Sequence, residues 1–166
     1  MAFQFNGVVP TSIMFNGVSL TDLFFNGVQV WSSVVPPQEI GLFYGGVSTS
    51  SLNLVTHIDA SGVLVGSETS VGTARGAPAG ASVGGNGLFY AGVSSDVSYD
   101  TVTRIDASGV LVGSETSVGT ARNVLAGASV GGNGMFYGGY TNVNYDTVTR
   151  IDASGVLVGS ETSVGT

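Results

Sequence analysis

Three near-identical copies of one segment limit what this chain can fold into more than any other feature. The string Ile-Asp-Ala-Ser-Gly-Val-Leu-Val-Gly-Ser-Glu-Thr-Ser-Val-Gly-Thr begins at Ile58, Ile105 and Ile151. An aromatic segment precedes each copy and begins at Gly41, Gly87 and Gly134, which gives a period of 46 or 47 residues. A repeat of this length predicts one small structural unit that is built several times, each copy burying a face of the next.

Each repeat contains four short segments with strand character, separated by turn sequences. In the last copy these segments are Ala126–Val130, Met135–Gly139, Thr147–Asp152 and Val156–Thr162. Gly-Gly-Asn-Gly joins the first two, and Asp-Ala-Ser-Gly joins the last two, with aspartate and glycine where turns favour them. Four antiparallel strands in about 47 residues are typical of a β-propeller blade, so the predicted fold class is all-β.

A second repeat, with a period of ten residues, occupies the first thirty residues. Phe-Asn-Gly-Val begins at Phe5, Phe15 and Phe25. Asn-Gly between alternating apolar residues is the strongest short signal for a β-hairpin, so we predict three hairpins. Apolar residues two apart fall on one face of a strand and predict a hydrophobic anchoring surface. Its members are Phe3, Phe5, Ile13, Phe15, Leu23, Phe25 and Trp31.

The two periods divide the chain into an N-terminal hairpin module (residues 1–31), a proline-containing linker (32–40) and a repeat region (41–166). About thirty residues bury too little surface to be stable alone, so we expect the module to dock on the rest of the chain, on sister copies or on a larger assembly. Closed propellers contain four to eight blades, whereas the repeat region holds about two and a half. We therefore expect an incomplete propeller, completed by a longer chain or by several copies in a homo-oligomer.

Composition excludes several classes of function. The 166 residues include no cysteine, which excludes disulfide scaffolds, cysteine-based zinc sites and thiol catalysis. Lysine is also absent, and four arginines in a chain of net charge −7 form no basic patch for nucleic acid. The sequence has no apolar run of about 18 residues, so no membrane insertion is expected.

Acidic residues recur at two positions of every repeat: Asp59, Asp106 and Asp152 at one, and Glu68, Glu115 and Glu161 at the other. An active site is unique, whereas a residue present in every copy is better explained as a turn former or a strand-edge charge. His57 has no second histidine nearby in the sequence and is interpreted as a solvated strand residue. We therefore predict no catalytic residues, no metal site and no cofactor. Arg75 and Arg122, which follow Thr-Ala between repeats, are interpreted as structural ties.

The copies differ mainly in two connections, one after the second strand and one between the fourth strand and the next first strand. In an up-and-down blade both connections emerge on the same side, so one face varies on a constant scaffold. Binding surfaces are built in this way, although neutral drift after duplication would give the same pattern. The predicted ligand-binding residues are Ser50, Asn53, Asp96, Tyr99, Tyr140, Asn142 and Asn144. Tyrosine and asparagine suit a glycan or a protein surface.

The repeats resemble kelch repeats. The resemblance rests on Thr120-Ala121-Arg122, the Gly-Asn-Gly turn, the aromatic strand ending in Tyr137-Gly138-Gly139, and the segment Asp146–Asp152. It covers residues 41–166 and implies four-stranded propeller blades. Ile105 and Ile151 stand where kelch blades usually carry tyrosine, so the repeats are kelch-like.

The Phe-Asn-Gly module ahead of a glycine-rich repeat region resembles the start of tailed-bacteriophage tail fibre or tail-associated proteins. This resemblance implies a structural virion protein, assembled in the host cytoplasm. Residues 1–31 would bind other virion proteins, and the repeats would attach to a glycan or protein on the host surface. Two alternatives remain at this stage. One is a purely structural baseplate, neck or capsid decoration protein, and the other is a propeller enzyme acting on surface polysaccharide with its active site outside this sequence.

Overall fold

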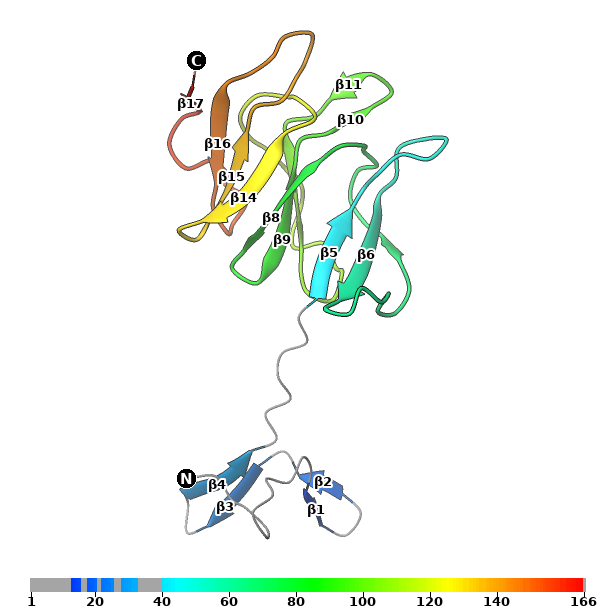
Figure 1. The fold of residues 1–166 in the computed structure, drawn as a ribbon, viewed down its shortest axis with the longest axis vertical. Coiled ribbons are helices and arrows are strands. Elements are labelled where there is room, and N and C mark those ends of the chain that lie inside the picture. The colour runs from blue at the N-terminus through cyan, green and yellow to red at the C-terminus, as the bar shows by residue number, and fades with distance from the viewer. Residues whose placement is uncertain (1–12, 16–17, 21, 26–27, 33–39, 166) are drawn as a thin grey trace. The chain divides into compact units, whose positions relative to one another are not determined.

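The computed structural model describes residues 13–15, 18–20, 22–25, 28–32 and 40–165. Every regular element among them is a β-strand, and all strand pairs are antiparallel, which confirms the predicted all-β class (Figure 1). The chain forms two compact units, Met1–Gln38 and Glu39–Thr166. Within the described residues, no helix is long and apolar enough to cross a membrane.

The N-terminal unit contains two hairpins: β1 (Ile13–Phe15) pairs with β2 (Val18–Leu20), and β3 (Asp22–Phe25) pairs with β4 (Val28–Ser32). Phe15 pairs with Val18 and Phe25 with Val28, so each connection is the two-residue Asn-Gly step, as predicted. Ile13, Leu23 and Trp31 of the predicted anchoring surface also lie in these strands. The first predicted hairpin, with Phe3 and Phe5, and residues 33–39 of the linker lie outside the described residues.

The C-terminal unit contains three main sheets that follow one another in the sequence. The first sheet has the order β5-β6-β7, the second β13-β12-β9-β8 and the third β14-β15-β16-β17. A small hairpin, β10-β11, lies in a loop of the second repeat. The strands are β5 (Ile40–Tyr44), β6 (Leu54–Asp59), β7 (Thr69–Ser70), β8 (Ala79–Val83), β9 (Asn86–Tyr90), β10 (Val93–Ser94), β11 (Val97–Ser98), β12 (Thr101–Ile105), β13 (Thr116–Ser117), β14 (Ala126–Val130), β15 (Asn133–Tyr137), β16 (Thr147–Ile151) and β17 (Thr162–Ser163).

Glycines fix where the first two strands of a repeat begin and end. Gly131 and Gly132 have φ of 56° and 77°, the left-handed values that both central residues of a type I′ hairpin turn require. The turn therefore occupies only Gly-Gly, and β15 begins at Asn133 rather than at the predicted Met135. The strand ends at Tyr137, two residues earlier than predicted, because Gly138 and Gly139 again have positive φ.

The predicted fourth strand, Val156–Thr162, is wrong in most of its length. The structure has only the two-residue strand β17, preceded by an isolated bridge between Ile151 and Leu157. Gly159 interrupts the segment with a φ of 76°, a conformation that an extended strand does not contain. The first strand matches its predicted bounds, and the third ends one residue early, at Ile151.

The three sheets pack face to face through one repeated pair of aromatic residues. Tyr44 of the first sheet contacts Phe89 of the second with ring centroids 5.3 Å apart, and Tyr90 of the second contacts Phe136 of the third at 5.2 Å. The buried aliphatic residues Val55 and Ile105 join the first contact, and Leu88, Val102 and Ile151 join the second. Each sheet thus places its phenylalanine face on the tyrosine face of the preceding sheet.

A fully buried arginine fastens each pair of sheets. Arg75, in the connection between the first two sheets, donates to the carbonyl oxygens of Ala91 and Thr101, at 3.0 Å each, and forms an ion pair with Glu115. Its guanidinium also lies 5.7 Å from the Tyr44 ring centre. Thr73 donates to the other carboxylate oxygen of Glu115 at 2.5 Å. This confirms the interpretation of the arginines as structural ties, and it makes Glu115 more than a strand-edge charge.

The same arrangement recurs between the second and third sheets. Arg122 is also fully buried and pairs with Glu161 at 2.9 Å. Thr120 donates to that carboxylate at 2.5 Å. Glu68 occupies the equivalent position in the first sheet, and the hydrogen bond found to its carboxylate comes from Thr56, at 2.7 Å. The repeat therefore carries an internal control, a glutamate in the same sequence context without a described arginine partner.

The ion pairs make the stability of the repeat unit sensitive to acid. Burial raises the pKa of Glu115, but hydrogen bonds from Thr103 and Thr73 and the charge of Arg75 outweigh burial and hold the pKa below its ordinary value. Burial likewise opposes the hydrogen bonds and the arginine at Glu161, with the same net lowering of the pKa. A carboxyl whose pKa is lowered by folding adds stability above the unfolded pKa, about 4.3, and loses it as the pH falls through the folded pKa.

We predict that replacing Glu115 and Glu161 by glutamine lowers the free energy of unfolding by about 2 kcal/mol or more at pH 7, because each change leaves a buried arginine without its counter-charge. The difference from the wild type should shrink below about pH 4, where the wild-type carboxyls also become protonated. Urea unfolding followed by circular dichroism between pH 7 and pH 3 measures both effects. The Glu68→Gln variant is the control and should change little, and a difference that stays constant over the whole pH range would contradict the assignment.

Candidate functional site

The variable connections of the three repeats gather at one end of the sheets. Segments 45–53, 91–100 and 138–146 all lie at the upper edge in Figure 1. Isolated bridges join Gly76 to Val93 and Asn123 to Tyr140, so the connections between sheets, 76–78 and 123–125, lie at the same edge. We call these five segments the variable rim.

Side-chain hydrogen bonds join neighbouring repeats along the variable rim. Ser51 Oγ donates to the carbonyl oxygen of Val93 at 3.3 Å, and Asn123 Nδ2 donates to Ser98 Oγ at 3.0 Å. The loops of the first and second repeats are therefore connected, and so are those of the second and third. The variable rim is a continuous surface rather than three separate loops.

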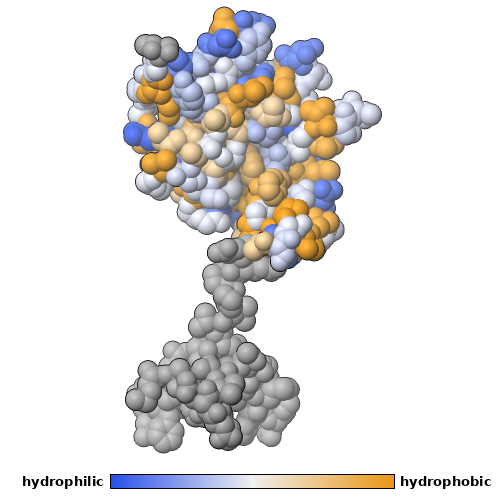
Figure 2. Space-filling model, in the orientation of Figure 1, coloured by the Kyte–Doolittle hydropathy of each residue, from blue (hydrophilic) through white to orange (hydrophobic). Residues whose placement is uncertain are grey.

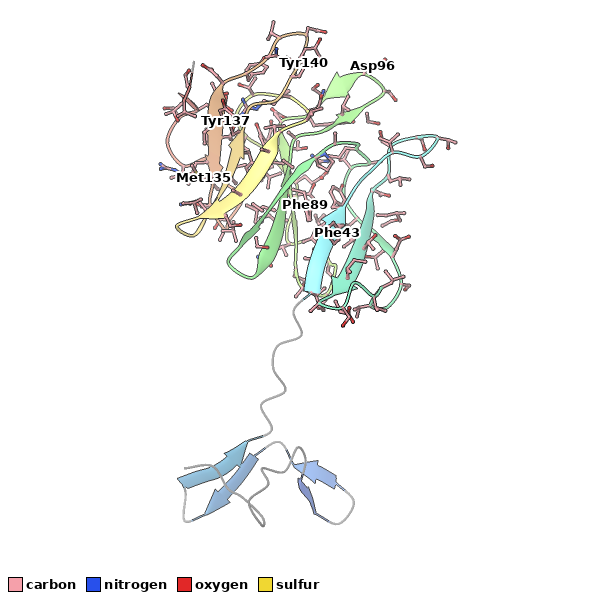
Figure 3. The ribbon with its side chains drawn as sticks, in the orientation of Figure 1. Phe43, Phe89, Asp96, Met135, Tyr137 and Tyr140 are labelled. Atoms are coloured by element: carbon pink, nitrogen blue, oxygen red, sulfur yellow. The ribbon has the colours of Figure 1, made fainter. Side chains whose placement is uncertain are left out.

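The structure divides the predicted ligand-binding residues into two groups. Five are exposed on the variable rim, namely Ser50, Asp96, Tyr140, Asn142 and Asn144, and Figure 3 shows Asp96 and Tyr140 at its edge. The other two are half-buried and make structural contacts. Asn53 Nδ2 donates to the carbonyl oxygen of Gly72 at 3.3 Å, and the Tyr99 ring centre lies 5.5 Å from the guanidinium of Arg75.

Sequence reasoning missed the apolar part of the variable rim. Valines at four positions are more than half exposed there: Val47, Val97, Val124 and Val143. Together with Tyr140, which is 47% exposed, they place apolar surface among polar side chains, and Figure 2 shows both kinds of residue along the upper edge. Valine in a β-rich sequence is expected in the core. Only the position of these valines inside the divergent loops could have indicated that they are exposed.

Backbone conformation separates the variable rim from the rest of the unit. Six described non-glycine residues have positive φ, and all six lie in its segments: Ala77, Ala91, Ser95, Asp96, Val124 and Asn142. The left-handed region costs an ordinary residue about 1–2 kcal/mol, and a β-branched residue such as Val124 is rare there. Ser95 and Asp96 are the turn residues of the β10–β11 hairpin, which requires positive φ, and asparagine also tolerates this region, so the strained positions are Ala77, Ala91 and Val124. Strained residues cluster at functional sites, which makes the variable rim a candidate site.

The opposite end of the sheets is nearly identical in all repeats. Asp152 Oδ1 accepts the amides of Ser154, at 2.8 Å, and Val156, at 3.0 Å, and Asp59 and Asp106 hold their turns in the same way. This confirms the aspartates as turn formers, because in each turn the Oδ1 atom accepts two backbone amides. We call the three Asp-Ala-Ser-Gly turns the constant rim.

The interpretation of His57 as a solvated residue is wrong. Its side chain is 7% exposed and lies against the turn of the second sheet, where a Cβ on Gly109 would stand only 2.3 Å from His57 Cε1. The absence of a side chain at Gly109 is what lets the ring be buried there. No group of three histidine, cysteine, aspartate or glutamate residues that could hold a metal ion occurs in the described part of the chain.

The variable rim offers mainly neutral hydrogen-bonding groups and apolar surface. Its five segments contain no lysine, arginine or histidine. Their acidic residues are Asp96, Asp100 and Asp146, of which Asp100 and Asp146 accept hydrogen bonds from Ser117 and Ser163. Amide, hydroxyl and aromatic groups offer hydrogen bonds and a flat apolar ring. No protein-family model matches the chain, and no curated protein matches its sequence.

We predict that Val124→Gly stabilises the repeat unit by up to about 1 kcal/mol, because glycine relieves the left-handed strain while the 67% exposed valine side chain buries little. Thermal and urea unfolding measure the change. Val143→Gly is the matched control, since this exposed valine has no positive φ, and the variant should lose about 0.5–1 kcal/mol. Equal destabilisation by both substitutions would show that the strain is absent.

Proposed function

We propose that the chain is a structural, non-enzymatic virion protein of the phage tail-fibre or tail-associated class, which attaches to host cells through the variable rim. The observation that carries the proposal is that strained backbone, exposed valines and most of the sequence variation coincide on one rim of an otherwise copied scaffold. A scaffold that repeats while one surface varies is the usual arrangement of a recognition surface.

In this proposal the three sheets are blades of a kelch-like β-propeller. Each complete sheet has four antiparallel strands in chain order, and each packs its phenylalanine face on the tyrosine face of the sheet before it. Radial packing of four-stranded sheets is the arrangement that defines a propeller. The N-terminal hairpins form the anchor to other virion proteins in this proposal, because two-stranded hairpins are marginally stable by themselves and need a partner.

The chemistry of the variable rim favours a neutral glycan on the host surface. Asn142, Asn144 and Ser50 supply donors and acceptors for sugar hydroxyls, and Tyr140 supplies a ring on which the apolar face of a sugar packs. The net charge of −7 disfavours anionic ligands at long range.

We predict that the full chain, fluorescently labelled, binds intact bacterial cells of the host and that the double variant Tyr140→Ala, Asn142→Ala reduces this binding at least about tenfold, the loss expected for an aromatic anchor and its polar neighbour. Flow cytometry measures the binding. Periodate treatment of the cells should abolish it, and protease treatment should not.

The control variant is Val110→Ser with Val156→Ser, two exposed valines beside the constant rim, and it should bind like the wild type. Equal binding by all three proteins would contradict the role of the variable rim. Immunogold labelling of purified phage particles checks the virion assignment separately, and we expect label on the tail; particles without label would contradict it.

A further inference from the structure

Among the residues that the structure describes, the first sheet has three strands, one fewer than the second and third sheets. In the second and third sheets, β8 and β14 pair with β9 and β15 in the same register, from Ala79 opposite Tyr90 in one and Ala126 opposite Tyr137 in the other. In the first sheet the equivalent inner strand is β5, and among the described residues it pairs only with β6. Within residues 40–165, the other edge of β5 therefore has no partner strand.

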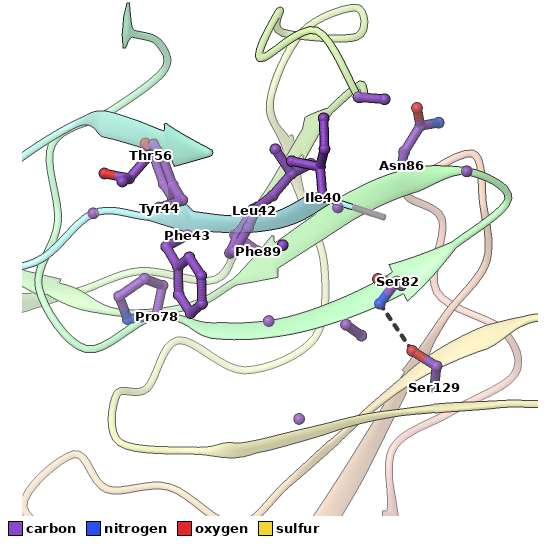
Figure 4. Close-up of a pocket in the computed structure, with 18 of the residues that line it drawn as sticks. Ile40, Leu42, Phe43, Tyr44, Thr56, Pro78, Ser82, Asn86, Phe89 and Ser129 are labelled. Carbon is purple, nitrogen blue, oxygen red and sulfur yellow. Dashed lines mark hydrogen bonds between the residues drawn. The ribbon is translucent and has the colours of Figure 1, made fainter. Parts of the chain in front are cut away.

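A groove of about 850 Å³ lies beside this free edge. It is lined by β5, by residues 80–82 of β8, by residues 127–129 of β14 and by Phe89 (Figure 4). Phe43, on the same strand, is 60% exposed, whereas the equivalent Phe89 and Phe136 are 7% and 0% exposed beneath the preceding sheets. Figure 2 shows hydrophobic surface over this part of the first sheet.

Close contacts between β8 and β14 show what is missing from the groove. A Cβ on Gly127 would meet the carbonyl oxygen of Gly80 at 2.3 Å, so the two strands pack backbone against backbone. A Cβ on Gly80, at the same position one repeat earlier, would meet only the Phe89 ring of its own sheet within 4 Å. Gly80 of the second sheet therefore packs against Gly127 of the third sheet. No described residue of the first sheet packs against Gly80 in the same way.

A hydrogen bond between β8 and β14 also indicates that a strand can lie beside β5. Ser129 Oγ accepts the backbone amide of Ser82 at 2.8 Å, which joins β14 to β8 (Figure 4). Ser82 is the equivalent of Ser129, is exposed and lines the groove. Its hydroxyl is therefore positioned to accept an amide from a strand lying beside β5.

The sequence just before β5 is poorly suited to this position. Ile40 is the equivalent of Asn86, so residues 33–37 are the sequence equivalents of β8. They read Ser-Val-Val-Pro-Pro, whereas β8 and β14 read Ala-Gly-Ala-Ser-Val. Proline would stand where the amide has to donate to Ser82 Oγ, and proline has no amide hydrogen. The third residue of an added strand must also be small. Its equivalent in β8 is Ala81, whose Cβ would lie only 3.3 Å from a Cβ built on Gly134 of the next sheet.

We propose that the groove beside β5 binds an added β-strand with the sequence Ala-Gly-Ala-Ser-Val, donated by another copy of this repeat. The strand pairs antiparallel with β5, its first residue opposite Tyr44 and its last opposite Ile40, as β8 pairs with β9. Addition of a strand to a free edge combines backbone hydrogen bonds with selection by side-chain size. This binding does not depend on the host-attachment role of the variable rim.

The test uses the full chain and a fluorescent peptide with the sequence of residues 125–133, Leu-Ala-Gly-Ala-Ser-Val-Gly-Gly-Asn. We expect a saturable rise in fluorescence anisotropy, and protection of amides within Ile40–Tyr44 from hydrogen exchange. A peptide with leucine in place of its third strand residue, the equivalent of Ala128, should bind about tenfold more weakly or worse, because overpacking costs about 1–3 kcal/mol.

In the protein, Ser82→Phe should abolish peptide binding by filling the groove and removing the acceptor. Ser154→Phe, at an exposed turn of the third repeat, is the matched control and should bind like the wild type. Circular dichroism checks that both variants are folded. If Ser82→Phe does not fold, the comparison of the two peptides on the wild-type protein still tests the proposal. No binding of the repeat peptide, equal binding of both peptides, or protection outside β5 would each overturn the proposal.

Discussion

The contact between consecutive sheets is the interaction on which the rest of the repeat unit depends. No single sheet of four short strands buries enough surface to be stable, so the tyrosine face of one sheet must be covered by the phenylalanine face of the next. At each contact a fully buried arginine forms an ion pair with a glutamate of the following repeat. Arg75 also donates hydrogen bonds to carbonyl oxygens and to a threonine hydroxyl of that repeat. A buried guanidinium tolerates few alternative arrangements, because each lost partner leaves an unsatisfied charge. The pair therefore fixes how one sheet lies on the next.

This contact also explains where the sequence is constant and where it varies. The threonine and arginine ahead of the second and third sheets belong to the contact and are copied. The same holds for Glu115 and Glu161, which precede the last strands of those two sheets. Glycines such as Gly127 are copied because backbone packs directly against backbone. Among the described residues, the loops of the variable rim contribute to the charge cluster the Ala91 carbonyl oxygen, which accepts from Arg75, and the rings of Tyr99 and Tyr145, which lie near the two arginines. The remaining residues of these loops are therefore free to adopt strained conformations and to expose valines on a scaffold that remains fixed.

Local signals in the sequence predicted local structure well. The Gly-Gly and Asp-Ala-Ser-Gly turns lie where predicted, because left-handed φ and aspartate-to-amide hydrogen bonds are properties of a few adjacent residues. The fourth strand was wrong because its apolar residues suggest an extended strand, whereas the positive φ of Gly159 interrupts it and Glu161 forms an ion pair with the distant Arg122. His57 was misjudged because Gly109, against which it is buried, is distant in sequence. The contacts of Asn53 with Gly72 and of Tyr99 with Arg75 have no local sequence signal for the same reason. The groove beside β5 has no local sequence signal, because it depends on how sheets distant in sequence lie in space.

The central claim is that a buried arginine and a glutamate from the next repeat hold consecutive sheets together as one coupled pair. A double-mutant cycle with Arg75→Met, Glu115→Gln and the double variant measures this coupling directly by urea unfolding at pH 7. The account predicts a coupling free energy of about 2–3 kcal/mol, with the double variant less destabilised than the sum of the two single variants. Strictly additive effects, with a coupling near zero, would contradict it.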